Sequence, residues 1–397
     1  MISGRLWKRL AWLALAAVIW TAVSAGAETA RDVTMQCGLT AGASGKNLQQ
    51  CVDRNYETYW RSANGDKAWI EVEMPEGETA SGVEVQWHEH PHAWGIQQLT
   101  EAGTWEDLVH SDSQYLTDYL ALPEGIRRFR VANAPGEKRH FNLTELRVYG
   151  AGERPAEVQQ WNPPAEKADL MLLAAHPDDE ILWFGGTLPT YAGEKKKVCQ
   201  VCMMVPSRGC RRLELLDCLW TCGVKNYPVW GRFADAYTGS LKQQYTRWNK
   251  ERVYDLVIEW IRRFKPEVLL THDVNGEYGH GGHRACADAA MEGVRLAANK
   301  KKYPRSAREF GTWDVPKCYL HLYGENRAEM DWRQPLEAFG GRTSFDVAEE
   351  AFRCHVSQQK TSYRVMDWGE CSCSLFGLYR SLVGPDTAGG DFFENLE

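Results

Sequence analysis

Histidines and acidic residues gather at two places in the chain, each directly after an apolar run. The first is His176-Pro177-Asp178-Asp179-Glu180, which follows the run from Leu170 to Ala175. The second extends from His272 to His283, follows the run from Val268 to Thr271, and ends in the pattern His280-x-x-His283. Imidazoles and carboxylates are the ligands and proton carriers of hydrolytic metal sites. The two segments therefore predict one shared site.

The chemistry of such a site follows from its side chains. Two histidines and one aspartate form a three-ligand zinc site whose fourth position holds water. Zinc lowers the pKa of that water towards ~7 and polarises the carbonyl group under attack. A carboxylate off the metal must accept the water's proton, and a donor must reach the leaving nitrogen. Asp178 and His280 are the candidates, although capping of a helix explains Asp178 and Asp179 equally well at this stage.

The segments AHPDDE (175–180) and THDVNGEYGHGGH (271–283) resemble the PIG-L, or LmbE-like, family of zinc-dependent de-N-acetylases, over residues 167–397. The resemblance implies that His176, Asp179 and His283 bind zinc, that Asp178 is the general base, and that His280 stabilises the oxyanion or protonates the amine. It places Tyr278 beside the site as an assisting hydroxyl. Further candidates for substrate contact or support are Arg211, Glu214 and Asn275, the first two lying in RGCRRLELLDCLWTCGV (208–224), which resembles the family's Arg-x-x-Glu helix.

The chain departs from the family pattern at one point. The family commonly has Pro-Asp between its last two histidines, where this chain has Gly281-Gly282. An acid at that position would support a histidine by a hydrogen bond, and its loss would weaken the orientation of that histidine. The three predicted ligands are nevertheless present.

Strands and helices alternate around these motifs. We expect strands at 170–175, 198–205 and 268–271, and helices at 179–192, 211–222, 246–264 and 282–299. Alternation of this kind predicts an α/β domain with a Rossmann-like, mostly parallel sheet. The carboxyl ends of parallel strands meet at one edge of a sheet, which is where both motifs fall.

Residues 28–150 have a different pattern, with short alternating strands such as 68–73 and 82–87. This pattern predicts an antiparallel β-sandwich or jelly roll. LQQCVDRNYETYW (48–60), GVEVQW (82–87) and LTELRVYG (143–150) resemble the discoidin, or coagulation factor 5/8 C-type, domain, which implies carbohydrate binding. Trp60, Trp94 and Trp105 either stack on sugars or fill the core. A second metal site at His88, His90 and His92 is disfavoured because no acid-rich motif lies nearby.

Residues 1–27 have the pattern of a signal peptide, with Arg5, Lys8 and Arg9 ahead of an apolar run and a cleavage site near Ala27. The alternative is an uncleaved anchor, but the run is shorter than the ~20 residues that span a bilayer. Cleavage would remove three positive charges and no negative ones, changing the formal charge from −7 to −10. An acidic secreted or extracytoplasmic protein is a poor partner for nucleic acids.

Twelve cysteines in an exported chain predict some disulfides, with Cys37 and Cys51 the most plausible pair. Residues 151–166, which contain Pro155, Pro163 and Pro164, predict an extended linker between two separable domains.

The leading function is zinc-dependent hydrolysis of an N-acyl group, N-acetyl in the family, from an amino sugar or glycan. The first alternative is an amidase for another acylated amine. The second is a glycan-binding protein with a vestigial zinc site.

Overall fold

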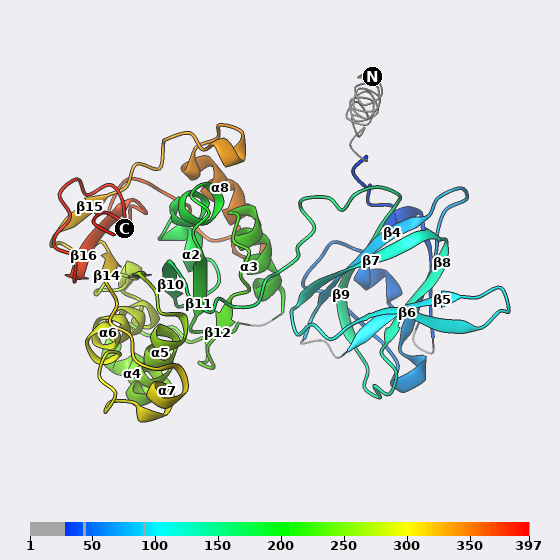
Figure 1. The fold of residues 1–397 in the computed structure, drawn as a ribbon, viewed down its shortest axis with the longest axis horizontal. Helices are drawn as coiled ribbons and strands as arrows, with labels where there is room; N and C mark the ends of the chain where they lie inside the picture. Colours follow the sequence, from blue (N-terminus) through cyan, green and yellow to red (C-terminus); the bar gives the residue numbers. More distant parts are fainter. Residues whose placement is uncertain (1–27, 43–44, 90–92, 208, 397) are drawn as a thin grey trace, which may run out of the picture.

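The computed structural model describes residues 28–42, 45–89, 93–207 and 209–396. The expected signal peptide, and with it the cleavage site, lies outside these residues, as do His90 and His92. Figure 1 shows an N-terminal part built of strands and a C-terminal part in which strands and helices alternate. Among the described residues, none of the helices is long and apolar enough to span a bilayer.

The N-terminal part contains two antiparallel sheets, and its helical segments are short 3-10 turns. One sheet has the order β1-β3-β8-β5-β6, with β1 Gly38–Ala41, β3 Trp69–Glu73, β8 Arg128–Asn133, β5 Trp94–Leu99 and β6 Trp105–Ser111. The other has the order β2-β9-β4-β7, with β2 Trp60–Arg61, β9 Asn142–Tyr149, β4 Ala80–Trp87 and β7 Thr117–Ile126. The two sheets meet where Trp87 and Trp94 lie 5.6 Å apart between ring centroids.

Two of the three tryptophans considered for sugar stacking belong to this core. Trp60 and Trp94 are each 1% exposed, so neither offers a ring face to a ligand. Trp105 is half-buried, and the guanidinium of Arg130 lies 3.9 Å from its ring centroid and 3.7 Å from that of Trp69. The core alternative is therefore correct for Trp60 and Trp94.

The C-terminal part is built on a seven-stranded sheet of order β12-β11-β10-β13-β14-β16-β15. The first five strands pair in parallel, whereas β16 pairs antiparallel with β14 and β15. Their bounds are β10 Leu170–Ala174, β11 Cys199–Met203, β12 Val229–Trp230, β13 Val268–Thr271, β14 Lys317–His321, β15 Arg327–Glu329 and β16 Leu375–Ser381. The expected mixed α/β fold with a mostly parallel sheet is thus present.

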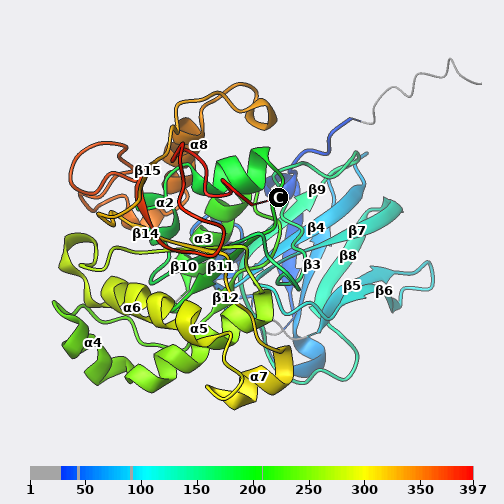
Figure 2. The ribbon, with the colours of Figure 1, turned by 60° about the vertical axis from the view of Figure 1, so that its left-hand side comes forward.

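Helices cover both faces of this sheet because alternate residues of a buried strand point to opposite sides. Leu170 and Leu172 pack with α3 and α8, whereas Met171 and Leu173 pack with α5 and α6. Figure 2 shows α2, α3 and α8 on one side and α4 to α7 on the other. The helices are α2 Asp179–Leu182, α3 Cys210–Thr221, α4 Leu241–Trp248, α5 Lys250–Phe264, α6 Gly281–Leu296, α7 Pro304–Phe310 and α8 Ser344–Arg353.

Two expected helices are interrupted. The helix expected over 179–192 stops at Leu182. Gly185 follows with φ +45°, and a Cβ at this position would lie 2.4 Å from Cys373 Sγ. The close approach of the C-terminal segment therefore requires glycine at 185. The helix expected over 246–264 divides at Asn249, which has φ 62° and caps α5 by accepting a hydrogen bond from the Arg252 N–H.

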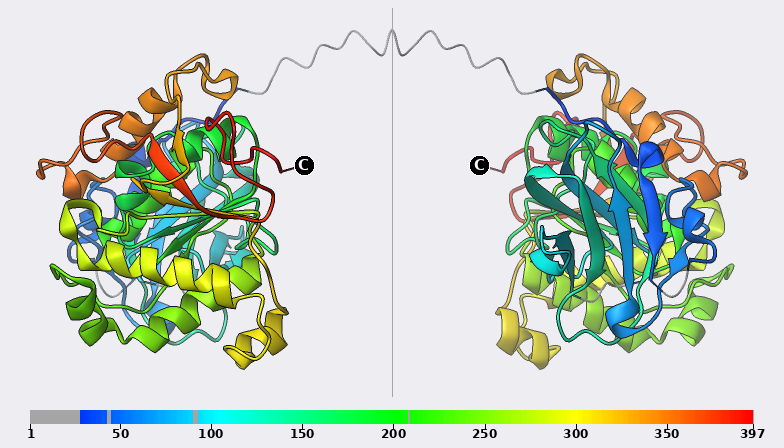
Figure 3. Two further views of the ribbon diagram at one scale, coloured as in Figure 1. Left: turned by 90° about the vertical axis from the view of Figure 1, so that its left-hand side faces the viewer. Right: turned by 90° about the vertical axis from the view of Figure 1, so that its right-hand side faces the viewer.

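The linker and the two parts pack against each other. In residues 151–166, Val158 and Trp161 are buried, and the Trp161 ring contacts Trp220 and Tyr227 of the α/β part. Tyr56 donates a hydrogen bond to Asp217 of α3 at 2.7 Å. Figure 3 shows the two parts from their outer sides. The segment is therefore a packed element rather than a free tether.

All twelve cysteines carry free thiols. The expected Cys37–Cys51 pair is not formed: Cys37 Sγ contacts the Val33 carbonyl at 3.4 Å and Cys51 Sγ donates to the Leu48 carbonyl at 3.0 Å.

The contact between Leu116 and Tyr227 tests whether the two parts stabilise each other. The buried Leu116 N–H donates to the Tyr227 hydroxyl at 3.0 Å, so Tyr227→Phe leaves a buried donor unpaired. We expect the free energy of unfolding to fall by about 1–3 kcal/mol in chemical denaturation. Tyr303→Phe, which removes a surface hydrogen bond to Glu251, is the control and should change it by less than about 0.5 kcal/mol. Equal effects of the two variants would contradict a stabilising interface.

Candidate active site

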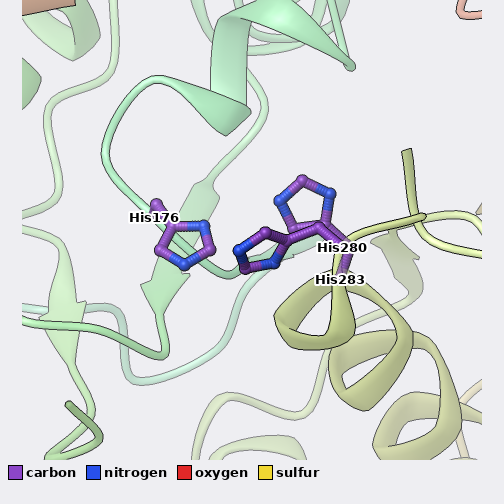
Figure 4. Close-up of side chains that lie close together, drawn as sticks. All are labelled: His176, His280 and His283. Atoms are coloured by element: carbon purple, nitrogen blue, oxygen red, sulfur yellow. The ribbon is translucent and has the colours of Figure 1, made fainter. Parts of the chain in front are cut away.

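The two sequence motifs meet at the carboxyl ends of β10 and β13, around a cavity of about 130 Å³. Figure 4 shows His176 on the loop after β10, and His280 and His283 at the start of α6, with their rings close together. The cavity is lined by His176, Asp178, Asp179, Leu182, Trp183, Arg211, Asp235, Tyr278, His280, Gln358 and Tyr363.

Asp179 lies between the two motifs and contacts both. Its Oδ2 accepts a hydrogen bond from the His176 N–H at 2.7 Å and lies 3.1 Å from His176 Nδ1. Its Oδ1 accepts from Trp183 Nε1 at 2.8 Å and lies 3.2 Å from His283 Nε2. Burial opposes ionisation of this carboxyl, but His283 and His176 hold its pKa well below the usual range. Asp179 is therefore a buried carboxylate.

Asp178, the next residue towards the N-terminus, has different partners. Its φ of 112° is strained for a residue with a side chain. Its N–H donates to Glu180 Oε2 at 2.8 Å, and its Oδ1 accepts from Arg211 Nη2 at 2.9 Å. Although Asp178 occupies the N-cap position of α2, it makes no side-chain capping bond. The capping alternative is therefore not seen for Asp178.

The protonation equilibrium of Asp178 suits proton transfer near neutral pH. Burial, followed by the charge of Asp179, raises its pKa to about 7, while Arg211 works in the opposite direction. A carboxyl group with a pKa near the working pH can both accept and return a proton.

His280 is held by the backbone of α6. Its Nδ1 accepts a hydrogen bond from the Gly282 N–H at 3.0 Å, so in the neutral ring Nε2 has the proton. Burial, followed by the charges of His283 and His176, lowers the pKa of His280 to about 3. His280 is therefore a neutral hydrogen-bond donor at the cavity wall.

Packing explains Gly281 and Gly282. The Gly281 N–H donates to the Thr238 carbonyl at 2.7 Å, a bond that proline could not make, and a Cβ at 281 would lie 2.0 Å from Thr238 Oγ1. A Cβ at 282 would lie 3.0 Å from the His280 ring. The two glycines thus let α6 begin against the loop at 238 and next to His280.

Glu277 supplies the buried acid that Gly281-Gly282 does not. Its Oε2 lies 2.8 Å from both His272 Nδ1 and His283 Nδ1, and its Oε1 lies 2.6 Å from His321 Nδ1. All four side chains are fully buried. Burial opposes ionisation of Glu277, but His272 and these contacts hold its pKa well below the usual range. Glu277 therefore fixes the orientation of the His283 ring through its contact with Nδ1.

Among the described residues, three groups of side chains bring ligand atoms within 4.8 Å of one another. They are His176, His280 and His283; Asp179, His272 and His283; and Glu180, Cys218 and His355. The predicted set of His176, Asp179 and His283 spans the first two groups rather than coinciding with either.

His272 is engaged elsewhere. Its Nε2 accepts a hydrogen bond from the Ala175 N–H at 3.1 Å, and its Nδ1 faces Glu277. Because a neutral imidazole has one acceptor nitrogen, this bond leaves no lone pair for a metal. By contrast, neither His176 Nε2 nor His283 Nε2 makes a well-aligned hydrogen bond among the described residues, although His283 Nε2 lies 3.2 Å from Asp179 Oδ1. Unpaired imidazole nitrogens beside a carboxylate fit a bound divalent cation.

Of the other predicted residues, some line the cavity and others do not. Tyr278 lines the cavity, is 43% exposed, and its ring centroid lies 5.6 Å from that of His280. Arg211 also lines it, whereas Glu214 of α3 does not and accepts a hydrogen bond from the Ser357 hydroxyl at 2.6 Å. Asn275 is exposed, does not line the cavity, and its backbone N–H donates to Asp273.

Several site residues were not predicted. Asp235 is half-exposed at the mouth, 3.7 Å from His176 Nε2 and 3.6 Å from Arg211 Nη1. His355 lies 2.6 Å from Glu180 Oε1 in full burial, and Gln358 lines the cavity. His355 and Gln358 lie three residues apart in the C-terminal segment, so the pattern His-x-x-Gln was the only local signal for them, and Asp235 follows no motif.

The fold and the site together place this chain among α/β proteins in which histidines and carboxylates meet at the carboxyl ends of parallel strands. Residues 171–294 match the family model described as "PIG-L: GlcNAc-PI de-N-acetylase". The 1D-myo-inositol 2-acetamido-2-deoxy-alpha-D-glucopyranoside deacetylase 1 of Catenulispora acidiphila is 28% identical over 215 residues, 47% of this chain and 65% of that protein. The chain thus spans slightly less than two thirds of that relative.

A second relative is the N-acetylglucosaminyl-phosphatidylinositol de-N-acetylase of Bos taurus, 25% identical over 219 residues, 54% of this chain and 83% of that protein. The solved N,N'-diacetylchitobiose deacetylase of Pyrococcus horikoshii is similar over 48% of this chain and 71% of its own, with 18% identity and a TM-score of 0.37. The sequence relatives are deacetylases of molecules that contain N-acetylglucosamine.

Glu277→Gln tests the buried network directly. The amide keeps the size of the side chain but removes the charge that faces three imidazoles, and loss of one partner of a buried ion pair costs about 3–5 kcal/mol. We expect a loss of that order in the free energy of unfolding, measured by denaturant titration. Glu259→Gln, which weakens a surface contact with Arg305, should cost less than about 1 kcal/mol. A Glu277→Gln protein as stable as the control would contradict the role given to Glu277.

Proposed function

We propose that this chain is a zinc-dependent hydrolase that removes an N-acetyl group from an amino sugar in a glycan. The observation that supports this most is the division between the two adjacent aspartates. Asp179 lies among imidazoles with unpaired nitrogens, whereas Asp178 is turned towards Arg211 at the cavity wall. Deacetylases among the relatives indicate the class of substrate.

His176, Asp179 and His283 would hold the zinc ion. The two histidines offer buried Nε2 atoms without hydrogen-bond partners, and Asp179 contacts both rings. Bound there, zinc supplies acidification of water and polarisation of the amide carbonyl. A set with His280 in place of Asp179 is the competing arrangement, because its ligand atoms also lie within 4.8 Å of those of His176 and His283. It would require His280 to give up the hydrogen bond that its Nδ1 accepts from the Gly282 N–H.

Asp178 would accept the proton of the attacking water. It lines the cavity and is not among the contacts of His176 or His283, so its carboxylate is free to act on a molecule in the cavity. Arg211 fixes the direction of this carboxylate through Oδ1. Fixed orientation removes the need for side-chain reorganisation during proton transfer.

His280 and Tyr278 would act on the acyl oxygen and on the leaving nitrogen. His280 presents its Nε2–H while Nδ1 is held by Gly282, and the Tyr278 ring lies beside it. Both groups are donors at the cavity wall, which suits stabilisation of a developing oxyanion. Arg211 and Asp235 stand at the mouth and would bind sugar hydroxyls.

Two further parts of the proposal concern residues away from the cavity. A signal peptide at 1–27 would place the enzyme outside the cytoplasm, where glycans are the accessible substrates. The discoidin-like N-terminal part would hold the enzyme near a glycan, although Trp60 and Trp94 are not its contact residues because they are buried.

The adjacent aspartates give the first test. Asp178→Asn should keep its zinc and its melting temperature but lower the rate of acetate release by about 10²–10⁴-fold, the range of general-base catalysis. Asp179→Asn should lose zinc and activity together. Zinc is measured by elemental analysis and acetate by a coupled assay. An Asp178→Asn enzyme with unchanged turnover would rule out the base, and full zinc occupancy in Asp179→Asn would favour the set containing His280.

Metal content gives the second test. The protein should bind one zinc ion per chain, and removal by a chelator should abolish acetate release until zinc is returned. Unfolding should also shift to lower temperature after removal, since a cation that binds only the folded state stabilises it. Full activity in metal-free protein would contradict the proposal.

A further inference from the structure

The cavity at the proposed active site is too small to hold a whole glycan. Its volume of about 130 Å³ is below the ~300–1,000 Å³ of most small-molecule sites. The acyl group and the reacting edge of one sugar would fill it. The remainder of a larger substrate must therefore lie outside, on surfaces next to the mouth.

Tyr237 lies next to the catalytic cavity, beside His280, with its ring open to solvent. It is 66% exposed, an unusual state for an aromatic side chain, and its ring centroid lies 5.2 Å from that of His280. Tyr237 does not line the catalytic cavity but lines a second, larger cavity of about 560 Å³. The Tyr237 ring thus belongs to a neighbouring groove and contacts His280, which lines the catalytic cavity.

The groove beyond Tyr237 is lined by residues with hydrogen-bonding side chains. It is formed by the loop at 237–239 and by exposed side chains of α4, Gln243, Thr246 and Arg247. Arg247 is exposed and forms no ion pair with an acidic residue in the described part of the chain, so its donors are available. An aromatic face next to amide and guanidinium donors matches a pyranose, which has an apolar C–H face and a rim of hydroxyls.

The loop that holds Tyr237 is fixed in place before any ligand binds. The Thr238 carbonyl accepts the Gly281 N–H at 2.7 Å, and Thr238 Oγ1 donates to the buried Gln244. The same Gly281 N–H begins α6, which carries His283, and α4 lies beside α6 in Figure 2. A site that needs little ordering on binding loses less conformational entropy.

We propose that this groove binds a second sugar ring, and hence that the substrate is an oligosaccharide or polysaccharide in which the acetylated sugar is linked to at least one further sugar. Tyr237 stacks on that second ring, and Gln243 and Arg247 bind its hydroxyls. This inference rests on the proposed function, because it extends the substrate of the same active site.

The test compares two probes of different length, the methyl glycoside of N-acetylglucosamine and N,N'-diacetylchitobiose. The unmodified enzyme should have a higher kcat/KM for the disaccharide. Tyr237→Ala should lower the disaccharide-to-monosaccharide ratio of kcat/KM about tenfold, mainly through KM, because an aromatic contact is lost. Tyr237→Phe keeps the ring and should restore the ratio. Leu382→Ala, a change of another exposed apolar residue beside Pro316 at the start of β14, should leave the ratio unaltered.

Binding separates this inference from the proposed function. Diacetylchitobiose is titrated calorimetrically into Asp178→Asn protein with and without Tyr237→Ala, and weaker binding in the double variant is expected. One result would refute the proposed deacetylase activity and leave the second-sugar site standing. In it, the unmodified enzyme releases no acetate from either probe, but the binding of diacetylchitobiose still depends on Tyr237. Equal kcat/KM for the two probes, or a ratio and an affinity insensitive to Tyr237→Ala, would overturn the second-sugar site.

Discussion

The active site depends on two ionised carboxylates that are buried among imidazoles. Asp179 contacts His176 and His283, and Glu277 contacts His272, His283 and His321. Removing a carboxylate from water is costly unless charges and donors surround it. The rings therefore cannot turn away without leaving a buried charge unpaired. This constraint joins β10, β13, β14 and α6 at one point and holds the imidazole nitrogens towards the cavity.

Backbone geometry points the side chains of the two adjacent aspartates in different directions. Asp179 is the first residue of α2 and faces the histidines, whereas the left-handed φ of Asp178 turns its side chain towards α3 and Arg211. Glu180 holds the strained residue by accepting the Asp178 N–H, and His355 in turn contacts Glu180. A strained residue that is held by its surroundings in this way is typical of functional sites. The N-terminal part also has an indirect connection, because Tyr56 binds Asp217 on α3.

The sequence was informative where local pattern and chemistry agree. Apolar runs ending in His176 and His272 predicted β10, β13 and the place where their polar residues meet. Glu277 was not predicted because its role depends on β14, which brings His321 to it from 44 residues away. Asp235 and Tyr237 lie on a loop without a motif, so only the fold reveals them. Gly281 and Gly282 suggested a weakened site, yet the structure shows that they make space for His280 and Thr238, while Glu277 supports His283.

The proposed chemistry requires that His176, Asp179 and His283 together bind a catalytic zinc ion while Asp178 stays off the metal. Crystals of the zinc-loaded protein, measured on both sides of the zinc absorption edge, test it most directly. We expect one anomalous peak per chain within bonding distance of His176, Asp179 and His283, with Asp178 bonded to Arg211. A peak bonded to His280 in place of Asp179, a peak bonded to Asp178, or no peak in this cavity would contradict it.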